Sequence, residues 1–444
     1  MKKLILSLFT LTLSLTALGQ QAGDNFVIKT SEAGKTTEWS LAGDSKNGDI
    51  STIKHKGNQL ILYAKGYEGI EWATYDIDKI ESITFNVFHK GSYVEESAAQ
   101  AVKNMGIGTN FGNCTDVIAT WLNMDKNSVT DFEKAWGQEP TTKPMVDFLK
   151  QNGFNSVRIP VTWFQHMKAD GTVDEAWMNR IQEIVDYVID NGMYCILNVH
   201  HDTGADSDDV KHWIKADEAN YKENKEKFEY LWTQIATRFK NYDHHLVFEG
   251  YNEMLDANST WNAPKDASSY KGLNGYAQSF VNAVRATGGN NETRNLIVNT
   301  YAAACGDEVL NNLTIPSDKV EGHIAVEVHT YAPWDWFAQK GKWDASCSNE
   351  IKNMFTRLNS KFISKGIPCI IGEYGTHGSK SVSKNSSASE IQAAADQAAD
   401  IVKQAKAYGV ATFYWMSIFS EKDRTVPQWT LPTVVEAMKK AYNE

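Results

Sequence analysis

Eight short apolar segments, separated by stretches with helical periodicity, constrain the fold of this 444-residue chain more than any other feature. The segments lie at 107–111, 156–159, 194–199, 246–251, 295–299, 324–328, 369–372 and 411–414. After the second segment, Trp177, Ile181, Val185 and Val188 recur every three or four residues behind Asp174, a residue type that caps helix N-termini. Strands that alternate with helices form parallel sheets, and eight of them close into a barrel. The sequence therefore predicts an α/β fold of the (β/α)8 or TIM-barrel type over residues 105–444.

A small β-rich module precedes the predicted barrel. Segments 26–30, 60–63 and 83–87 are typical of short strands between glycine-rich turns. We therefore assign residues 20–90 to a β-rich accessory module and residues 91–104 to a linker or helix that joins it to the main domain. The module shows no constellation of catalytic residue types, so a structural appendage is the preferred interpretation.

The N-terminus has the pattern of a secretory signal peptide. Met1-Lys2-Lys3 precedes an apolar stretch at 4–18, and Ala17-Leu18-Gly19 forms a small-residue cleavage site. The stretch is too short for a membrane span, and no later segment is apolar for long enough to cross a bilayer. We expect residues 1–19 to be removed and the protein to be exported, either secreted or periplasmic.

Charge and cysteine content exclude several classes of partner and cofactor. The net charge of −11, without a long basic run, argues against nucleic acid or an anionic membrane as a partner. Five scattered cysteines without a CxxC pair give no zinc framework. Cys195 and Cys369 lie in apolar segments and are expected to be buried, while a disulfide among the other three stays open. We expect no cofactor and a monomeric protein.

Polar and aromatic side chains gather at the C-terminal ends of the predicted strands. They follow six of the eight strands, and they are Arg158, Trp163, His200, His201, Asn252, Glu253, His329, Tyr331, Glu373 and Trp415. Because the parallel strands of a barrel all end at one mouth, we expect these side chains to meet there. Two facing carboxylates are the minimal equipment for cleaving a glycosidic bond, and glutamate is rarely buried without a partner or a function. Glu253 and Glu373 are therefore the candidate catalytic pair.

His200 and His201 raise the alternative of a metal site. Adjacent residues of a strand point to opposite faces, so both imidazoles are not expected to bind one ion. No further Cys, His or Asp stands at ligand spacing in the sequence. The pattern favours a site without metal.

Several of these segments, in this order, resemble glycoside hydrolase family 5, the retaining (β/α)8 endoglycanases that include many cellulases. The matching stretches are Val157-Arg158-Ile159-Pro160, Asn198-Val199-His200-His201, Phe248-Glu249 to Asn252-Glu253, Val328-His329-Thr330-Tyr331, Ile371-Gly372-Glu373-Tyr374-Gly375 and Phe413-Tyr414-Trp415. Segment 106–113 also resembles the opening strand of subfamily 4, a group rich in endo-β-1,4-glucanases. Two positions depart from the family pattern: Met254 stands where proline usually follows the acid/base glutamate, and Met416-Ser417-Ile418 follow Trp415.

The resemblance implies a secreted endo-β-1,4-glucanase that hydrolyses internal linkages of a β-glucan polysaccharide by a retaining double displacement. In that mechanism Glu373 is the nucleophile, and Glu253 is the proton donor and then the general base. Arg158 and Tyr331 would favour the anionic form of Glu373, whereas Glu253, near His329, would keep its proton to higher pH.

The remaining residues would bind the polymer. Asn252 would hydrogen-bond the sugar 2-hydroxyl, and His200 and His201 would hold hydroxyls of the sugars before the cut. Trp415 would form the floor under the sugar being cleaved. Five tryptophans in loops after strands would extend the cleft, and they are Trp163, Trp213, Trp261, Trp334 and Trp336.

Three alternatives stay open. The same fold can act on xyloglucan, mixed-linkage β-glucan, mannan or xylan. The barrel can be a carbohydrate-binding protein without catalysis, which is disfavoured because a receptor needs none of the acid/base residues present here. A metal-dependent hydrolase is the third alternative.

Overall fold

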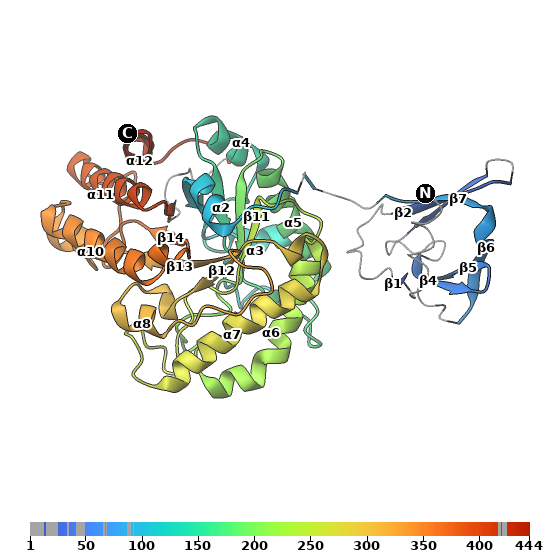
Figure 1. The fold of residues 1–444 in the computed structure, drawn as a ribbon. Coiled ribbons are helices and arrows are strands. Elements are labelled where there is room, and N and C mark those ends of the chain that lie inside the picture. The colour runs from blue at the N-terminus through green and yellow to red at the C-terminus, as the bar shows by residue number, and fades with distance from the viewer. Residues whose placement is uncertain are drawn as a thin grey trace. The chain divides into compact units, whose positions relative to one another are not determined.

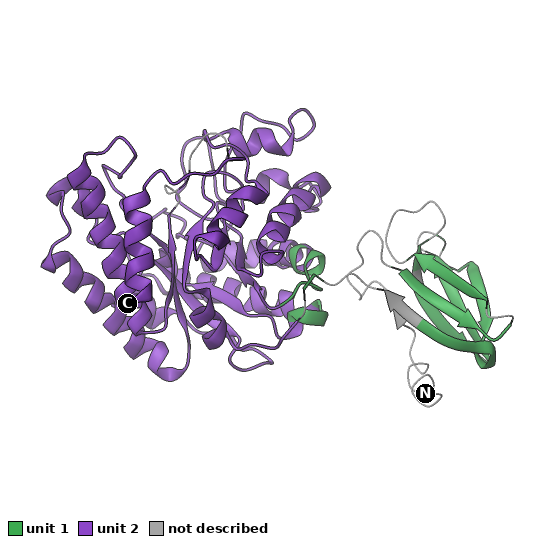
Figure 2. Cartoon of the chain, turned by 90° about the horizontal axis from the view of Figure 1, so that it is seen from above, with its two compact units in different colours: residues 1–92, 235–243, 287–291 green, residues 93–234, 244–286, 292–444 purple. Residues whose placement is uncertain are grey.

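The computed structural model describes residues 13–14, 25–32, 35–40, 49–64, 67, 69–86, 90–91, 93–415, 419 and 424–444. It divides the chain into two compact units (Figures 1 and 2). One unit comprises residues 1–92, 235–243 and 287–291, and the other comprises residues 93–234, 244–286 and 292–444.

The larger unit contains a closed barrel of eight parallel strands (Figure 1). In barrel order the strands are β8 (Ile107–Asn110), β9 (Ser156–Ile159), β10 (Tyr194–Asn198), β11 (Leu246–Glu249), β12 (Leu296–Asn299), β13 (Ile324–Thr330), β14 (Cys369–Tyr374) and β15 (Ala411–Tyr414), which pairs with β8. This confirms the predicted TIM barrel. Two strands are longer than predicted, because β13 continues through His329 and β14 continues through Glu373.

Helices follow the strands along the chain and surround the barrel (Figure 1). They are α3 (Val129–Lys134), α4 (Lys143–Gln151), α5 (Glu175–Ile189), α6 (Glu218–Arg238), α7 (Ala267–Ala286), α8 (Asp307–Asn312), α9 (Trp336–Lys340), α10 (Ala345–Lys361), α11 (Ala388–Ala407) and α12 (Pro432–Asn443). Short 3-10 turns occupy Phe164–His166, Gly289–Glu292, Tyr301–Ala303 and Ile363–Lys365. The predicted cap of α5 is present, since the Asp174 carboxylate accepts hydrogen bonds from the backbone N–H groups of Ala176 and Trp177.

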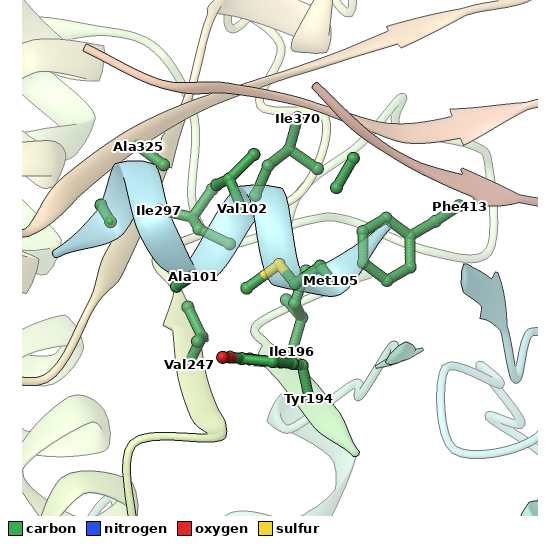
Figure 3. Packing of buried hydrophobic residues seen from close by; sticks show 12 residues of the cluster. Ala101, Val102, Met105, Tyr194, Ile196, Val247, Ile297, Ala325, Ile370 and Phe413 are labelled. Carbon is green, nitrogen blue, oxygen red and sulfur yellow. The ribbon is translucent and has the colours of Figure 1, made fainter. Parts of the chain in front are cut away.

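The helix α2 (Ala98–Met105) closes the N-terminal end of the barrel. Its buried residues Ala98, Ala101, Val102 and Met105 pack on apolar residues at the beginning of the strands (Figure 3), which are Tyr194, Ile196, Val247, Ile297, Ala325, Ile370, Ala411 and Phe413. The sequence assigned residues 91–104 to a linker or helix, and the structure shows a helix over the second half of that range, with buried residues that belong to the barrel core. With this end sealed by side chains, the C-terminal ends of the strands form the accessible mouth.

The smaller unit has two antiparallel sheets, as expected for a β-rich module. One sheet has the order β3 (Thr36–Ser40), β2 (Asn25–Thr30) and β7 (Ile80–Asn86). The other has the order β1 (Leu13–Ser14), β4 (Ile50–Lys56), β5 (Gln59–Ala64) and β6 (Glu71–Asp76), and a 3-10 turn at Ile77–Lys79 leads into β7. Their common core includes Phe26, Ile28, Ile50, Leu60 and Leu62.

Some predictions concern residues that the structure does not describe. Residues 1–12 and 15–19 of the predicted signal peptide lie outside the described residues, as do Val87 and Met416-Ser417-Ile418. The leader therefore stays a prediction, although its Leu13–Ser14 pairs with β4. Among the described residues, no helix is both long and apolar enough for a bilayer crossing. All five cysteines are described and carry free thiols, so the disulfide left open by the sequence is not formed.

Candidate active site

The two candidate catalytic carboxylates meet at the mouth of the barrel. Glu373 lies in β14, and Glu253 lies in the loop after β11, four residues beyond the strand end. An oxygen of each carboxylate and a ring nitrogen of His329 all lie within 4.8 Å of one another. Retaining glycosidases hold their two carboxyl groups about 5–5.5 Å apart, whereas inverting enzymes hold them about 6.5–9.5 Å apart. The arrangement has the short separation of the retaining class.

The loop that carries Glu253 is fixed by backbone hydrogen bonds. Asn252 donates its N–H to the Val199 carbonyl at 2.9 Å, and Met254 donates its N–H to the Asn252 carbonyl at 3.1 Å. Proline at position 254 would have no N–H for the second bond. Met254 is fully buried and its carbonyl accepts from the Ala302 N–H at 3.1 Å. The methionine N–H therefore adds one hydrogen bond to the acid/base loop that proline could not make, whereas the bond to the carbonyl is open to either residue.

Arg158 is the centre of a buried ionic cluster. Its guanidinium donates to both carboxylate oxygens of Glu249 at 2.7 and 2.8 Å and to Glu373 Oε1 at 2.9 Å. It also donates to the side-chain oxygens of Asn110 and Asn252 at 2.9 and 2.8 Å. All five N–H groups of the side chain are used in this way. Arg158 has no exposed surface, so it positions the nucleophile candidate and Asn252 together and is not a solvated residue.

Glu373 is held at both oxygens. Oε1 accepts from Arg158, and Oε2 accepts from the Tyr331 hydroxyl at 2.7 Å. These are the contacts expected from the sequence. Burial nevertheless raises the pKa of Glu373 to about 7, with the cations His329 and Arg158 limiting the rise. Arg158 and Tyr331 favour the anionic form of Glu373 as expected, but loss of hydration outweighs them, so the pKa lies above the ordinary glutamate value.

His329 lies between three carboxylates. Its Nδ1 is 2.9 Å from Glu253 Oε1 and 3.5 Å from Glu373 Oε2, and its Nε2 is 3.2 Å from Glu327 Oε1. Burial alone would lower the pKa of His329, but Glu373, Glu253 and Glu327 outweigh it and raise that pKa to about 10. A ring with a carboxylate at each nitrogen is stabilised as the imidazolium.

The tautomer of His200 follows from its neighbour Asn198. The Asn198 side-chain oxygen accepts from the Val161 N–H at 3.0 Å, so its amide nitrogen faces His200 Nδ1, also at 3.0 Å. Nδ1 therefore accepts, and Nε2 carries the proton, 4.0 Å from Glu373 Oε1. Burial holds the pKa of His200 well below its usual range, so the ring is a neutral donor. Its ring is parallel to that of Trp415, with centroids 5.8 Å apart.

His201 and His200 lie closer together than strand geometry suggests. Their ring centroids are 4.5 Å apart, because both residues follow the end of β10 and do not alternate within it. Together with Asp116 they place three potential ligand atoms within 4.8 Å of one another. A metal ion would need a ring nitrogen of His200 with a free lone pair. Nδ1 already accepts from Asn198 and Nε2 carries the proton, so this tautomer disfavours metal binding. Burial lowers the pKa of His201 to about 4, so it also acts as a neutral hydrogen-bonding group.

A cleft runs past the two carboxylates. A hollow of about 670 Å³ is lined by Glu253, Glu373, Trp415, Trp334 and Trp261, among others. A second hollow of about 450 Å³ shares His201, Asn252, Glu253 and Trp261 with the first. Free space therefore extends on both sides of Glu253, which suits a polymer better than a small molecule.

The tryptophans expected in the cleft fall into two groups. Trp261 and Trp334 are 55% and 64% exposed and line it. Trp163 does not, because it is fully buried and its Nε1–H donates to the Asn198 carbonyl at 2.9 Å. Trp336 is also buried, against Trp343, and Trp213 donates its Nε1–H to Asp202. Trp163 and Trp336 support the barrel and its loops, so their predicted place in the cleft is wrong. Trp213 is half-buried, and its place in the cleft stays a prediction.

Sequence reasoning missed two groups of site residues. Trp121 and Trp136, in the loops after β8, line the second hollow with 66% and 37% exposure. The rule that selected Trp261, an aromatic in a loop after a strand, would have found both. Inside the barrel, the missed residues are the buried polar groups Asn110, Asn198, Glu249, Asn299 and Glu327. In the sequence they are polar residues inside apolar strands, and Asn198 and Glu249 also belong to the stretches that resemble the family.

Comparison with known proteins agrees with this geometry. Residues 115–420 match the model of the Cellulase family, described as glycosyl hydrolase family 5. The chain is 35% identical over 367 residues to Cellulase/esterase CelE of Acetivibrio thermocellus, covering 77% of this chain and 40% of that protein. It is 33% identical over 387 residues to Endoglucanase 1 of Ruminococcus albus, covering 83% of this chain and 88% of that protein. The chain spans 40% and 58% of the length of the first two curated relatives that it matches.

Among solved structures, the chain is similar to PbGH5A, a glycoside hydrolase family 5 enzyme from Prevotella bryantii B14. The identity is 57% and the TM-score is 0.76, with 80% of this chain and 100% of the other covered. A mutant of PbGH5A has been solved in complex with the xyloglucan tetradecasaccharide XXXGXXXG.

Proposed function

Because the chain belongs to glycosyl hydrolase family 5, we propose that it is a retaining endo-β-1,4-glucanase that hydrolyses internal linkages of a β-glucan. The observation that carries the proposal is the close pair Glu253 and Glu373, with Arg158 and Tyr331 on the second carboxylate only. This asymmetry assigns the roles: the anchored Glu373 is the nucleophile, and the freer Glu253 is the acid and base.

The chemistry follows from these roles. Glu373 attacks the anomeric carbon and forms a covalent glycosyl-enzyme, while Glu253 gives its proton to the departing glycosidic oxygen. Glu253, now a carboxylate, takes a proton from water, and the hydroxide equivalent displaces Glu373 from the sugar. Two inversions at one carbon retain its configuration.

Asn252 is oriented to bind the sugar beside the cut. Arg158 donates to the Asn252 side-chain oxygen, so the amide NH₂ is the end left for substrate. It would donate to the sugar 2-hydroxyl, a contact that strengthens in the oxocarbenium-like transition state. His200 supplies a second donor through Nε2–H, and Trp415, parallel to it, supplies an apolar face for the sugar ring.

A pH prediction follows from the burial of Glu373. The nucleophile must be anionic, and burial places its pKa above the ordinary carboxyl range, at about 7. We expect kcat/KM to fall as the pH is lowered from about 7 towards the ordinary glutamate value of about 4.3. Initial rates on a soluble β-glucan across this range, at constant ionic strength, measure it. A profile flat down to pH 4.5 would show that Arg158 and Tyr331 outweigh burial.

Trp121 offers a test of the extended cleft. Trp121→Ala should reduce kcat/KM about three- to ten-fold on long oligosaccharides, because a stacked aromatic contributes about 0.5–1.5 kcal/mol beyond its area. Hydrolysis of the shortest cleavable oligosaccharides should change little. Trp72→Ala is a matched control, since Trp72 is a 37% exposed tryptophan in the N-terminal module. Equal losses on short and long substrates would place Trp121 outside the sugar-binding surface.

A second polymer is favoured by one specific observation. PbGH5A, similar over most of this chain, is known in complex with a xyloglucan oligosaccharide, and the small residues Ala302, Ala303 and Ala304 line the larger hollow here. Xyloglucan is therefore the alternative substrate. Product analysis on unbranched β-1,4-glucan, mixed-linkage β-glucan, xyloglucan, mannan and xylan separates the candidates. Absence of hydrolysis on every polymer would leave a carbohydrate-binding protein, and loss of activity with a chelator would revive a metal-dependent enzyme.

We also propose that residues 1–19 direct export and that the mature protein works as a monomer in the periplasm or outside the cell. The support is the sequence pattern of the leader. Intact mass of the exported protein should show an N-terminus at Gln20, and light scattering gives the oligomeric state.

A further inference from the structure

Glu327 is a buried carboxylate that the proposed mechanism does not use. It lies in β13 with no exposed surface. Its Oε1 is 3.3 Å from the Arg158 Nε and 3.2 Å from the His329 Nε2. An isolated buried carboxylate is strongly destabilising, so its partners have to compensate for lost hydration.

The fold keeps a place for this side chain. On the neighbouring strand β14, a Cβ built at Gly372 would lie 1.9 Å from Glu327 Oε1. Only glycine, without a side chain, leaves room for the carboxylate at this point. Gly372 directly precedes Glu373, so the space that admits Glu327 is part of the strand that carries the nucleophile.

Glu327 is linked to the acid/base residue through one side chain. The imidazole of His329 has Glu327 at Nε2 and Glu253 at Nδ1, at 3.2 and 2.9 Å. The three side chains form a line from the barrel interior to the cleft. Glu253 is the one of the three with substantial exposure, at 21% of its side chain.

We propose that Glu327 is a positioning residue that acts on Glu253 through His329, by holding a proton at His329 Nε2 so that Nδ1–H donates to Glu253 Oε1. The inference rests on the proposed function. The donated bond fixes Oε1 as an acceptor and leaves Oε2 of Glu253 to carry the acidic proton for the glycosidic oxygen. The same hydrogen bond also fixes the orientation of the Glu253 carboxyl group while the charge of Glu253 changes between the two steps.

The charges around the imidazole support this assignment. The groups that face or neighbour His329 are Glu253 from the loop after β11, Glu373 from β14, Glu327 from its own strand, and the cation Arg158 and neutral His200 beyond them. Burial and the nearby Glu249 raise the pKa of Glu327, as the carboxylates raise that of His329. The Glu327 carboxylate therefore accepts the Nε2–H of the His329 imidazolium.

The test is the pH profile of Glu327→Gln in the full chain. Glutamine keeps the size of the side chain but removes the negative charge that faces His329 Nε2. The pKa of His329 should then fall, so the alkaline limb of kcat/KM should move to lower pH by about one unit or more. Glu133→Gln is the matched control, because Glu133 is equally buried and paired with Arg180 outside the cleft. It should lower stability and leave the pH profile unchanged.

A double-mutant cycle shows whether Glu327 acts through His329. In a His329→Asn background, Glu327→Gln should cause no further shift of the alkaline limb. Additive shifts, or a lower melting temperature with an unshifted profile in Glu327→Gln, would overturn the inference. Glu327→Asp, which keeps the charge, should restore most of the original profile.

One measurement uses the unchanged protein, so it tests the inference even if the variants do not fold. Nitrogen-15 NMR of imidazole groups should show His329 with both ring nitrogens carrying protons at pH 8. A ring with an unprotonated Nδ1 at that pH would overturn the inference. Failure of the proposed function can be distinguished from failure of this inference, because the unchanged protein would then hydrolyse no β-glycan.

Discussion

Glu373→Gln and Glu253→Gln are each expected to lower kcat/KM on a soluble β-glucan by roughly 10⁴-fold or more, since single members of a catalytic unit carry effects of this size. Glutamine is close in size to glutamate and can still accept from Arg158 or His329, so both variants should fold. The loss then reports chemistry: glutamine is neither a nucleophile nor a proton donor. Circular dichroism and melting temperature confirm the fold, and reducing-sugar release measures the loss.

The two variants should differ in how their activity returns. A small glycine or alanine at position 373 should admit azide, which attacks the sugar directly and gives a product of inverted configuration. The Glu253 variant should still cleave aryl glycosides whose leaving group needs no proton, and then accumulate the glycosyl-enzyme. Substantial hydrolysis of β-glucan by either glutamine variant would end the assignment of the pair.

Arg158→Met should cause the largest loss of stability of any single substitution at the site. Glu249, Glu327 and Glu373 all contact this guanidinium in the barrel interior. Removing one partner of a buried ion pair lowers the free energy of unfolding by about 3–5 kcal/mol, because the remaining charges stay buried without compensation. Urea unfolding measures the change, and kcat/KM should fall as well, since Asn252 and Glu373 lose their common donor.

Arg285→Met is the matched control for this prediction. Arg285 is also buried and pairs with Asp318 at 2.6 Å, outside the cleft. We expect a comparable fall in stability with kcat/KM preserved in the folded protein. If Arg158→Met proved as stable as its parent, the carboxyl groups around it would have to be neutral in the native state.

The eight strands could be predicted because each contains buried apolar residues, such as Val157 and Ile159 in β9 and Ala411 and Phe413 in β15. The polar ends of β13 and β14 were assigned to loops for the same reason. His329 and Glu373 are polar, yet they continue strands, whereas Glu327 lies inside the predicted segment 324–328. In the mouth of this barrel the inward-facing strand positions hold ionic groups of opposite charge that pair with one another. A pattern of hydrophobic residues does not identify such strand positions.

The positions of aromatic side chains were less predictable. Trp163 and Trp261 follow strands in similar contexts, but the first donates to the Asn198 carbonyl in the interior and the second lies in the cleft. The sequence gives the residue type, whereas the direction of the side chain depends on contacts between segments that are distant in the chain. Strands β3 and β6 were missed for another reason: their residues are mostly polar and exposed or partly buried, although each pairs with the strand directly before it in the sequence.

The helix that seals the barrel floor also affects the order in which the chain can complete its folding. Ala101, Val102 and Met105 leave the ribosome early, but their partners include Ala411 and Phe413, near the other end of the chain. During synthesis this helix therefore has an apolar face without its final partners until almost the whole polypeptide exists. Contacts of such large sequence separation form slowly. The floor of the barrel is thus a late-forming element of the fold.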